Sequence, residues 1–314
     1  MADLRPSDVA GQPGLDKPIR DASTVLLMRD TTSGQGSEQG PEVYMVQRHR
    51  GNKFMANAHV FVGGRVDDED CVEGLEPRLR GRDAAARAKT LGYDDETVCR
   101  STPAREAIER ARGFYVAAVR EAFEESGILL AVDREGCAPR TSAELTRLRD
   151  ELNDGKLGFA ALLEQLNLFL PLDGLRLLTH WITPPFEVKR YDTQFFVARM
   201  PEGQQASFDP RETTGGQWCS PRDLLAQHHA EEIKLAPPTY CVLEDLAMAA
   251  SVDEALALTP DVAVPGISPR VLEGEDALTF LMPDDHRFDD ASSSAGREHY
   301  LVREGAHWRR VRSD

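Results

Sequence analysis

The sequence has few cysteines and no long hydrophobic segment. Its five cysteines are odd in number, scattered, and form no C-x-x-C pair, which argues against a disulfide framework and against a zinc cage. No apolar run approaches the roughly 20 residues that a membrane-spanning helix needs, and the first residues lack the apolar core of a signal peptide. We therefore expect a cytoplasmic protein in a reducing setting, with no membrane partner.

Basic residues are also scarce. The 314 residues include 37 Lys and Arg against 53 Asp and Glu, a formal net charge of -16. No nucleic-acid partner is expected, because neutralising phosphates requires a basic surface. A phosphorylated small molecule stays compatible with this charge if a divalent metal or a local basic cluster offsets the repulsion.

The order of sequence patterns predicts an α/β protein with additions. Strand patterns occur at residues 23–30, 42–50, 58–68, 175–183, 191–200 and 216–220. Helical patterns occur at residues 103–131, twice within 142–170, at 221–229 and at 237–251. Gly113 is a candidate break in the first helix, and Gly127 suits its C-terminal cap.

These patterns divide the chain into three parts. Residues 1–20 are polar and rich in Pro, Gly and Asp, which predicts a flexible leader. Residues 21–255 form the main domain, interrupted by a charged insertion at about 69–112. Residues 256–314 contain short strand patterns between turn residues, and we expect them to form a C-terminal β extension packed on the domain.

The stretch REAFEESG, from Arg120 to Gly127, carries a dense negative charge. On a helix, Glu121, Glu124 and Glu125 fall at i, i+3 and i+4 and therefore point to one face. Like charges at this spacing repel by roughly a few tenths of a kcal/mol per pair. A divalent cation reverses the sign of this interaction, and carboxylate oxygens are ligands that Mg²⁺ and Mn²⁺ prefer.

The alternative is a solvated acidic surface, which is what most charge runs are. The flanking segments FYVAAV and GILLA are strongly apolar, so we expect this helix to be largely buried. Unpaired carboxylates are costly in such a place, and Arg120 is suited to hold one of them bidentately. These features favour a metal site.

The acidic stretch resembles the second half of the Nudix box, G-x5-E-x7-R-E-U-x-E-E-x-G-U, in which U is aliphatic. The residues that match in order are Arg120, Glu121, Ala122, Glu124, Glu125, Gly127 and Ile128.

The first half of the box departs from this pattern. Gly64 is the natural leading glycine, yet Arg120 follows it by 56 positions (120 − 64), where the compact pattern has 14. An insertion of 42 residues (56 − 14) therefore interrupts the box. Counted back from Arg120, the middle glutamate position holds Arg112, and Glu109 and Glu106 are candidate substitutes.

An interrupted box preceded by F-M-x3-H-V-F-x-G-G is similar to one branch of the family, the larger Nudix hydrolases related to peroxisomal coenzyme A diphosphatase. That branch also has a strand like HWITP…RYDTQFF and an E-x5-W element, which is Glu212 to Trp218 here. The resemblance covers most of residues 22–311.

The resemblance implies a Nudix-type α/β/α sandwich with a mixed sheet, a helical insertion and a small C-terminal β extension. It implies hydrolysis of the diphosphate bond in a nucleoside diphosphate derivative, with coenzyme A or an acyl-coenzyme A as the first expectation. The implied cofactor is Mg²⁺ or Mn²⁺, bound by Glu121, Glu124 and Glu125.

The resemblance also implies roles for single residues. Glu121, Glu124 and Arg120 are the expected catalytic residues: a glutamate takes the proton from the attacking water, and Arg120 orients the cluster. Glu212 is a candidate additional ligand or base; its alternative is a glutamate on a surface loop.

Four residues are expected to bind substrate: Glu212, Gly63, Gly64 and Arg48. Gly63 and Gly64 would let the loop approach the metal and phosphate, or they simply end a strand. Arg48, beside Arg50 and Lys53, would contact a substrate phosphate; a solvated turn is the alternative.

Other functions stay open at this point. The substrate could instead be a nucleotide sugar, NADH, ADP-ribose or a dinucleotide polyphosphate. The glutamate missing at Arg112 keeps open a catalytically silent Nudix-fold binding or regulatory module. His228 and His229 are not expected to bind a metal, because adjacent helix residues do not share a face. A homodimer is compatible on base rate alone.

Overall fold

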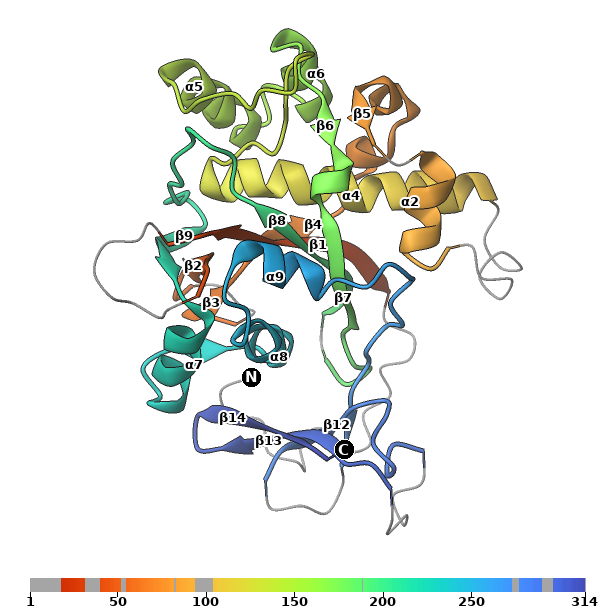
Figure 1. Cartoon of the computed structure of the whole chain (residues 1–314), viewed down its shortest axis with the longest axis vertical. Helices are drawn as coiled ribbons and strands as arrows, with labels where there is room; N and C mark the ends of the chain where they lie inside the picture. The colour runs from red at the N-terminus through yellow and green to blue at the C-terminus, as the bar shows by residue number, and fades with distance from the viewer. Residues whose placement is uncertain are drawn as a thin grey trace.

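Strands on both sides of the acidic segment form one mixed, eight-stranded sheet in the computed structural model (Figure 1). The structure describes residues 18–31, 40–51, 55–81, 83–93, 104–187, 189–272, 277–289 and 296–313. The sheet runs in the order β10 (Lys234–Leu235), β3 (Ala58–Val60), β2 (Glu42–Arg48), β1 (Ile19–Arg29), β8 (Arg190–Arg199) and β7 (Arg176–Ile182). In addition, β4 (Val62–Arg65) pairs with β1, and β9 (Thr213–Cys219) pairs with β2.

The central strand β1 shows why the sheet has two covered faces. It lies parallel to β8 and antiparallel to β2 and β4. Its side chains alternate: Val25 and Leu27 enter one core, whereas Leu26 and Met28 enter the other. Fully burying each such side chain contributes about 1.5–3 kcal/mol, so both faces must be covered by helices.

Helices cover the two faces as separate layers. One core contains buried residues of α4 (Ala104–Ser126), α5 (Ala143–Asn153) and α6 (Phe159–Gln165). The other contains residues of α7 (Pro221–His229), α8 (Pro237–Leu246) and α9 (Val252–Ala257). Figure 1 shows α4 on one side of the sheet and α8 on the opposite side. The predicted α/β class with a mixed sheet is therefore confirmed.

The segment between β4 and α4 packs on α4. Its described elements are η1 (Asp68–Cys71), η2 (Glu73–Arg78), β5 (Leu79–Arg80) and α2 (Ala84–Thr90). β5 pairs with β6 (Leu170–Pro171), which η3 (Leu172–Gly174) follows. Arg112 of α4 is buried and donates to Glu76 at 2.9 Å and to the Cys71 carbonyl. This arginine therefore attaches η1 and η2 to the helix.

Gly113 does not divide the first helix, so that expectation is wrong. α4 runs unbroken from Ala104 to Ser126. A Cβ added at Gly113 would lie 2.5 Å from the Cys71 sulfur and 2.7 Å from a methyl of Val66. The glycine is needed because η1 approaches the helix closely, and tertiary packing outweighs its low helix propensity.

The chain after α9 ends in a four-stranded antiparallel sheet. Its order is β11 (Arg270–Val271), β12 (Thr279–Leu281), β13 (His299–Glu304) and β14 (His307–Arg312). Trp308 attaches it to β10 and α7: the indole N–H donates to the Leu235 carbonyl at 3.1 Å, and the backbone N–H donates to His228 at 3.0 Å.

Several element boundaries differ from the expected ones. The pattern at 58–68 forms two strands, β3 and β4, interrupted at Phe61, and the pattern at 237–251 ends at Leu246, before α9. Ile19 and Arg20, assigned to the leader from sequence, begin β1, whereas residues 1–17 lie outside the described part of the chain. Among the described helices, none is long and apolar enough to cross a membrane.

Candidate active site

The acidic cluster lies on the last two turns of α4. Gly127 follows the helix with φ +70°, and its N–H donates to the Phe123 carbonyl at 2.9 Å, as expected for a C-terminal cap. Ile128 and Leu129, just beyond it, are fully buried. The helix end is therefore fixed in the core, and the glutamates before it are held in defined positions.

The two glycines of β4 lie directly against these glutamates. The Gly63 N–H donates to a carboxylate oxygen of Glu125 at 2.8 Å. A Cβ added at Gly64 would lie 2.5 Å from the Glu121 carboxylate, and one at Gly63 would lie 2.4 Å from the Ser23 carbonyl. A larger residue at Gly64 would displace the Glu121 carboxylate, and one at Gly63 would collide with β1 at Ser23 and Thr24. Both glycines therefore allow β4 to approach its neighbours closely.

Arg120 is buried at the centre of a charge network. Its guanidinium donates to both oxygens of Asp70, at 2.9 and 2.8 Å, and to the Arg65 carbonyl at 2.8 Å. The same group donates to Glu121 and to Glu124, each at 2.9 Å. The single planar guanidinium thus donates to three carboxylates, and it fixes the orientation of their side chains.

Asp70 is the residue that sequence reasoning missed. Counted forward from Gly64, the acid of G-x5-E falls on position 70 (64 + 6), where Asp70 stands. The residue is 1% exposed, and its carboxylate pairs bidentately with Arg120. The insertion therefore lies after the first acidic residue of the Nudix box and not before it. For this reason, counting back from Arg120 gave Arg112 for a position that Asp70 occupies. Glu106 is exposed on α4.

Burial disfavours the charged form of the cluster. It raises the pKa of Glu121 to about 8, with the Arg120 charge opposing this shift and Glu124 adding to it. Burial also raises the pKa of Glu124 and, more strongly, that of Glu125. A bound cation removes this penalty, because it favours ionised carboxylates.

The donor set suits a hard divalent cation. Glu125 is buried, and Glu121 and Glu124 on the same helix face are partly buried. Carboxylate oxygens of this kind are ligands that Mg²⁺ and Mn²⁺ bind. As placed, no group of three His, Cys, Asp or Glu side chains in the described part of the chain is arranged to hold an ion. Arg120 instead bonds both Glu121 and Glu124.

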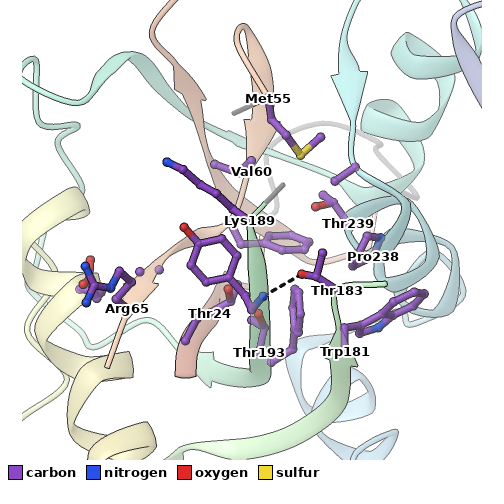
Figure 2. A pocket seen from close by; sticks show the side chains of 18 of the residues that line it. Thr24, Met55, Val60, Arg65, Trp181, Thr183, Lys189, Thr193, Pro238 and Thr239 are labelled. Carbon is purple, nitrogen blue, oxygen red and sulfur yellow. Dashed lines mark hydrogen bonds between the residues drawn. The ribbon is translucent and has the colours of Figure 1, made fainter. Parts of the chain in front are cut away.

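A cavity of about 690 Å³ opens beside the cluster (Figure 2). All eight residues predicted for the site line it: Arg48, Gly63, Gly64, Arg120, Glu121, Glu124, Glu125 and Glu212. Apolar side chains line another part of it, and in Figure 2 Trp181 and Pro238 lie across the view from Arg65. One cavity therefore joins an acidic end to an apolar wall.

Three cations of the cavity, Arg48, Arg65 and Lys189, make no ion pair within the described part of the chain. Burial raises the pKa of Glu125, and the charge of Arg48 opposes this shift. Neither Arg48 nor Lys189 makes a side-chain hydrogen bond with another residue that the structure describes. The Arg48 Nε is buried without an acceptor. By contrast, Arg190 is buried and donates to the Thr183 carbonyl. Lys53 lies outside the described residues, so its expected role has no structural counterpart here.

Glu212 faces the α4 carboxylates from another segment. It lines both the main cavity and a smaller one of about 140 Å³, together with Glu121, Glu124 and Glu125. Trp218, at the end of the E-x5-W element, packs against Tyr44 with ring centroids 5.3 Å apart and lies under Arg29. The E-x5-W element thus places Glu212 at the cavity and Trp218 within β9.

The histidine pair takes part in internal contacts. His228 accepts from the Trp308 N–H and its other ring nitrogen bonds the Ile233 carbonyl, while His229 bonds the Tyr240 hydroxyl at 3.2 Å. Both ring nitrogens of His228 are thereby occupied, so this residue joins α7 to the C-terminal sheet.

Comparison with known proteins agrees with this arrangement. The NUDT19 Nudix domain matches residues 19–246, most of the chain. This chain belongs to the Nudix family. Acyl-coenzyme A diphosphatase NUDT19 of Gallus gallus is 27% identical over 89% of this chain and 82% of its own, and the Homo sapiens protein of that name is 26% identical over 96% and 90%.

A solved structure gives the same assignment. The Nudix hydrolase from Alicyclobacillus acidocaldarius superposes with a TM-score of 0.63 at 25% identity, covering 77% of this chain and 97% of its own. The expected resemblance to the Nudix superfamily and to its coenzyme A diphosphatase branch is confirmed. The chain is a Nudix hydrolase, and its reaction is hydrolysis of a diphosphate.

Proposed function

We propose that the protein hydrolyses the diphosphate bond of coenzyme A or an acyl-coenzyme A, with Mg²⁺ or Mn²⁺ bound by Glu121, Glu124 and Glu125. The observation that supports the proposal is a single cavity lined both by the α4 carboxylates and by the cations Arg48 and Lys189, which make no ion pair with a described residue. The names of the relatives support the substrate, since both are acyl-coenzyme A diphosphatases.

The residues divide the work as follows. Arg120 and the Gly63 N–H hold the carboxylates in place. A divalent cation held there supplies charge neutralisation of the diphosphate and a lower pKa for a bound water. Arg48 and Lys189 contact substrate phosphates and offset the negative charge of the site.

Glu212 is the proposed general base, since the structure gives it no bond to Arg120 and it lines the cavity. It takes a proton from water as the water oxygen bonds to one phosphorus. The bond from that phosphorus to the bridging oxygen breaks, and this oxygen leaves with the other phosphate. For coenzyme A the products are 3′,5′-ADP and 4′-phosphopantetheine.

Other diphosphates would undergo the same chemistry, so a panel of substrates tests the proposal. Coenzyme A, NADH, ADP-ribose, a nucleotide sugar and diadenosine polyphosphates are incubated with the enzyme in Mg²⁺ and in Mn²⁺. We expect 3′,5′-ADP from coenzyme A. Preferred cleavage of another compound would discard the substrate and keep the chemistry.

Two variants on the same helix show whether the acidic cluster is responsible for the hydrolysis. Glu124→Gln removes one carboxylate charge of the cluster, and we expect turnover to fall about a hundred- to a thousandfold, as for loss of a main electrostatic contact in a catalytic site. Glu106→Gln, exposed on α4, is the matched control and should retain wild-type turnover. Silence of the wild type across the whole panel would instead favour a binding module.

A further inference from the structure

The apolar wall of the cavity is built from segments that lie far apart in the sequence. Trp181 comes from β7, Pro237 and Pro238 begin α8, Pro269 precedes β11, and Phe280 lies in β12. Prolines present hydrocarbon and no N–H. In Figure 2, Trp181 and Pro238 are both drawn on the side of the view opposite Arg65. The wall is therefore formed jointly by the main domain and the C-terminal segment.

The C-terminal contribution is firmly attached. Phe280 is 2% exposed and packs against Phe186 and Trp308, with ring centroids 5.9 and 5.4 Å apart. The segment before β11 is bonded to β7, since the Ile182 N–H donates to the Ile267 carbonyl at 2.9 Å and the Ile267 N–H to the His180 carbonyl at 2.8 Å. These contacts make the C-terminal sheet a fixed wall of the site.

Trp181 brings an unpaired donor to this wall. The residue is 6% exposed, and its indole nitrogen is buried without an acceptor among the described residues. A buried donor without an acceptor is costly, so an acceptor on a ligand or a water is needed. Hydrocarbon surface with a single N–H donor suits an uncharged chain that carries a carbonyl oxygen.

We propose that this wall is the subsite for the acyl-thioester end of the substrate, with the Trp181 N–H donating to the thioester carbonyl and Phe280 contacting the chain. The proposal rests on the proposed hydrolysis of coenzyme A derivatives. It makes the C-terminal sheet a determinant of substrate specificity, although the carboxylates lie on α4.

A chain-length series tests the subsite. We expect kcat/KM to rise from free coenzyme A through hexanoyl- to dodecanoyl-coenzyme A, by about fourfold for each methylene group that becomes buried. Trp181→Phe keeps an aromatic ring and removes the donor. It should lower kcat/KM for the acyl substrates about three- to tenfold and leave free coenzyme A within about twofold.

A matched pair of variants tests the C-terminal wall. Phe280→Leu should reduce the preference for dodecanoyl-coenzyme A over free coenzyme A at least about fivefold, because it removes apolar contact area. Phe288→Leu makes the same change in the same segment outside the cavity lining, where Phe288 stacks with Arg270. It should leave the preference unchanged. Equal kcat/KM for all chain lengths, or no effect of Trp181→Phe, would overturn the subsite.

Binding separates failure of the subsite from failure of the proposed function. Dodecanoyl-coenzyme A and free coenzyme A are titrated in EDTA and followed calorimetrically. Hydrolysis is not required for this test. If dodecanoyl-coenzyme A binds more tightly than free coenzyme A, and Trp181→Phe weakens the binding of the dodecanoyl compound, the subsite is supported even when no coenzyme A species is hydrolysed. Equal binding of both compounds overturns the subsite, as does a Trp181→Phe variant that weakens the binding of both compounds equally.

Discussion

Arg120 decides the geometry of the acidic cluster. Its guanidinium joins Asp70 from η1 to Glu121 and Glu124 from α4. The two glutamates repel each other and lose hydration in the buried site, and Arg120 compensates part of both penalties. The positions of Glu121 and Glu124 therefore depend, through Arg120, on Asp70, which lies on the other side of the insertion.

Replacement of Asp70 tests this dependence. Asp70→Asn keeps the shape of the side chain and removes its charge. Since removing one partner leaves the other charge buried, we expect the free energy of unfolding to fall by about 2–4 kcal/mol and turnover to fall about 10- to 100-fold. Urea unfolding and steady-state kinetics measure the two effects. Asp68→Asn changes an exposed aspartate of the same short helix and should alter neither quantity.

The raised pKa values predict a pH dependence of the metal-free protein. A carboxyl with a folded-state pKa above its unfolded value stabilises the fold at low pH, and this contribution is lost as pH rises through the folded value. For Glu121 the loss extends from about 4.5 to about 8, and Glu125 shifts in the same direction. The metal-free protein should therefore lose stability in this window because of the cluster.

Thermal unfolding of Glu125→Gln in EDTA isolates this effect. The Tm of the variant relative to wild type should rise between pH 6.5 and pH 8, since the variant carries no charge to bury. Burial lowers the pKa values of His59, His228 and His299, so their titration lies below this range. A constant Tm difference over the range would refute an ionisation penalty at Glu125.

At the scale of elements, α4 is the part that sequence pattern predicted best. The i, i+3, i+4 spacing, the apolar flanks and Gly127 are local signals, and a helix with a buried glutamate face and a glycine cap follows from them. Gly113 was misread because its reason is the close contact with Cys71 and Val66 of a segment about 40 residues away. Local propensity contains no information on such a contact.

Gly113→Ala tests that reading. Alanine favours a helix by about 1 kcal/mol, yet its Cβ would lie 2.5 Å from the Cys71 sulfur. We expect net destabilisation of about 1–3 kcal/mol in urea unfolding, because overpacking outweighs helix propensity. Gly74→Ala, with open space around the added Cβ, should be nearly neutral. A larger free energy of unfolding in Gly113→Ala would show that η1 can move away from the added methyl group without losing stability.

Across the protein as a whole, the cavity beside the acidic cluster joins three regions. α4 gives the carboxylates, β4 and β2 give the glycines and Arg48, and β7, α8 and the C-terminal sheet give the apolar wall. The carboxylates and glycines were predictable, since short motifs contain them. Asp70 and the Trp181–Phe280 wall were not predicted, because an insertion obscures the position of the first and only tertiary structure assembles the second.

The division into a main domain, an insertion and a C-terminal extension stays a prediction, as does a homodimer. The hydrogen bonds of Trp308 to Leu235 and His228 connect the C-terminal sheet to the preceding part of the chain. The Phe280 variant described above therefore probes the extension within the intact chain.

The metal dependence of 3′,5′-ADP formation from coenzyme A tests most directly whether the acidic cluster binds a catalytic metal ion. The enzyme is stripped with EDTA and titrated with Mg²⁺ or Mn²⁺, with Glu124→Gln and Glu106→Gln beside the wild type. We predict no product in EDTA, restoration by either metal in the wild type and in Glu106→Gln, and at least about a tenfold weaker metal response in Glu124→Gln. Equal product formation with and without metal, or an undiminished response of Glu124→Gln, would contradict a metal site at this cluster.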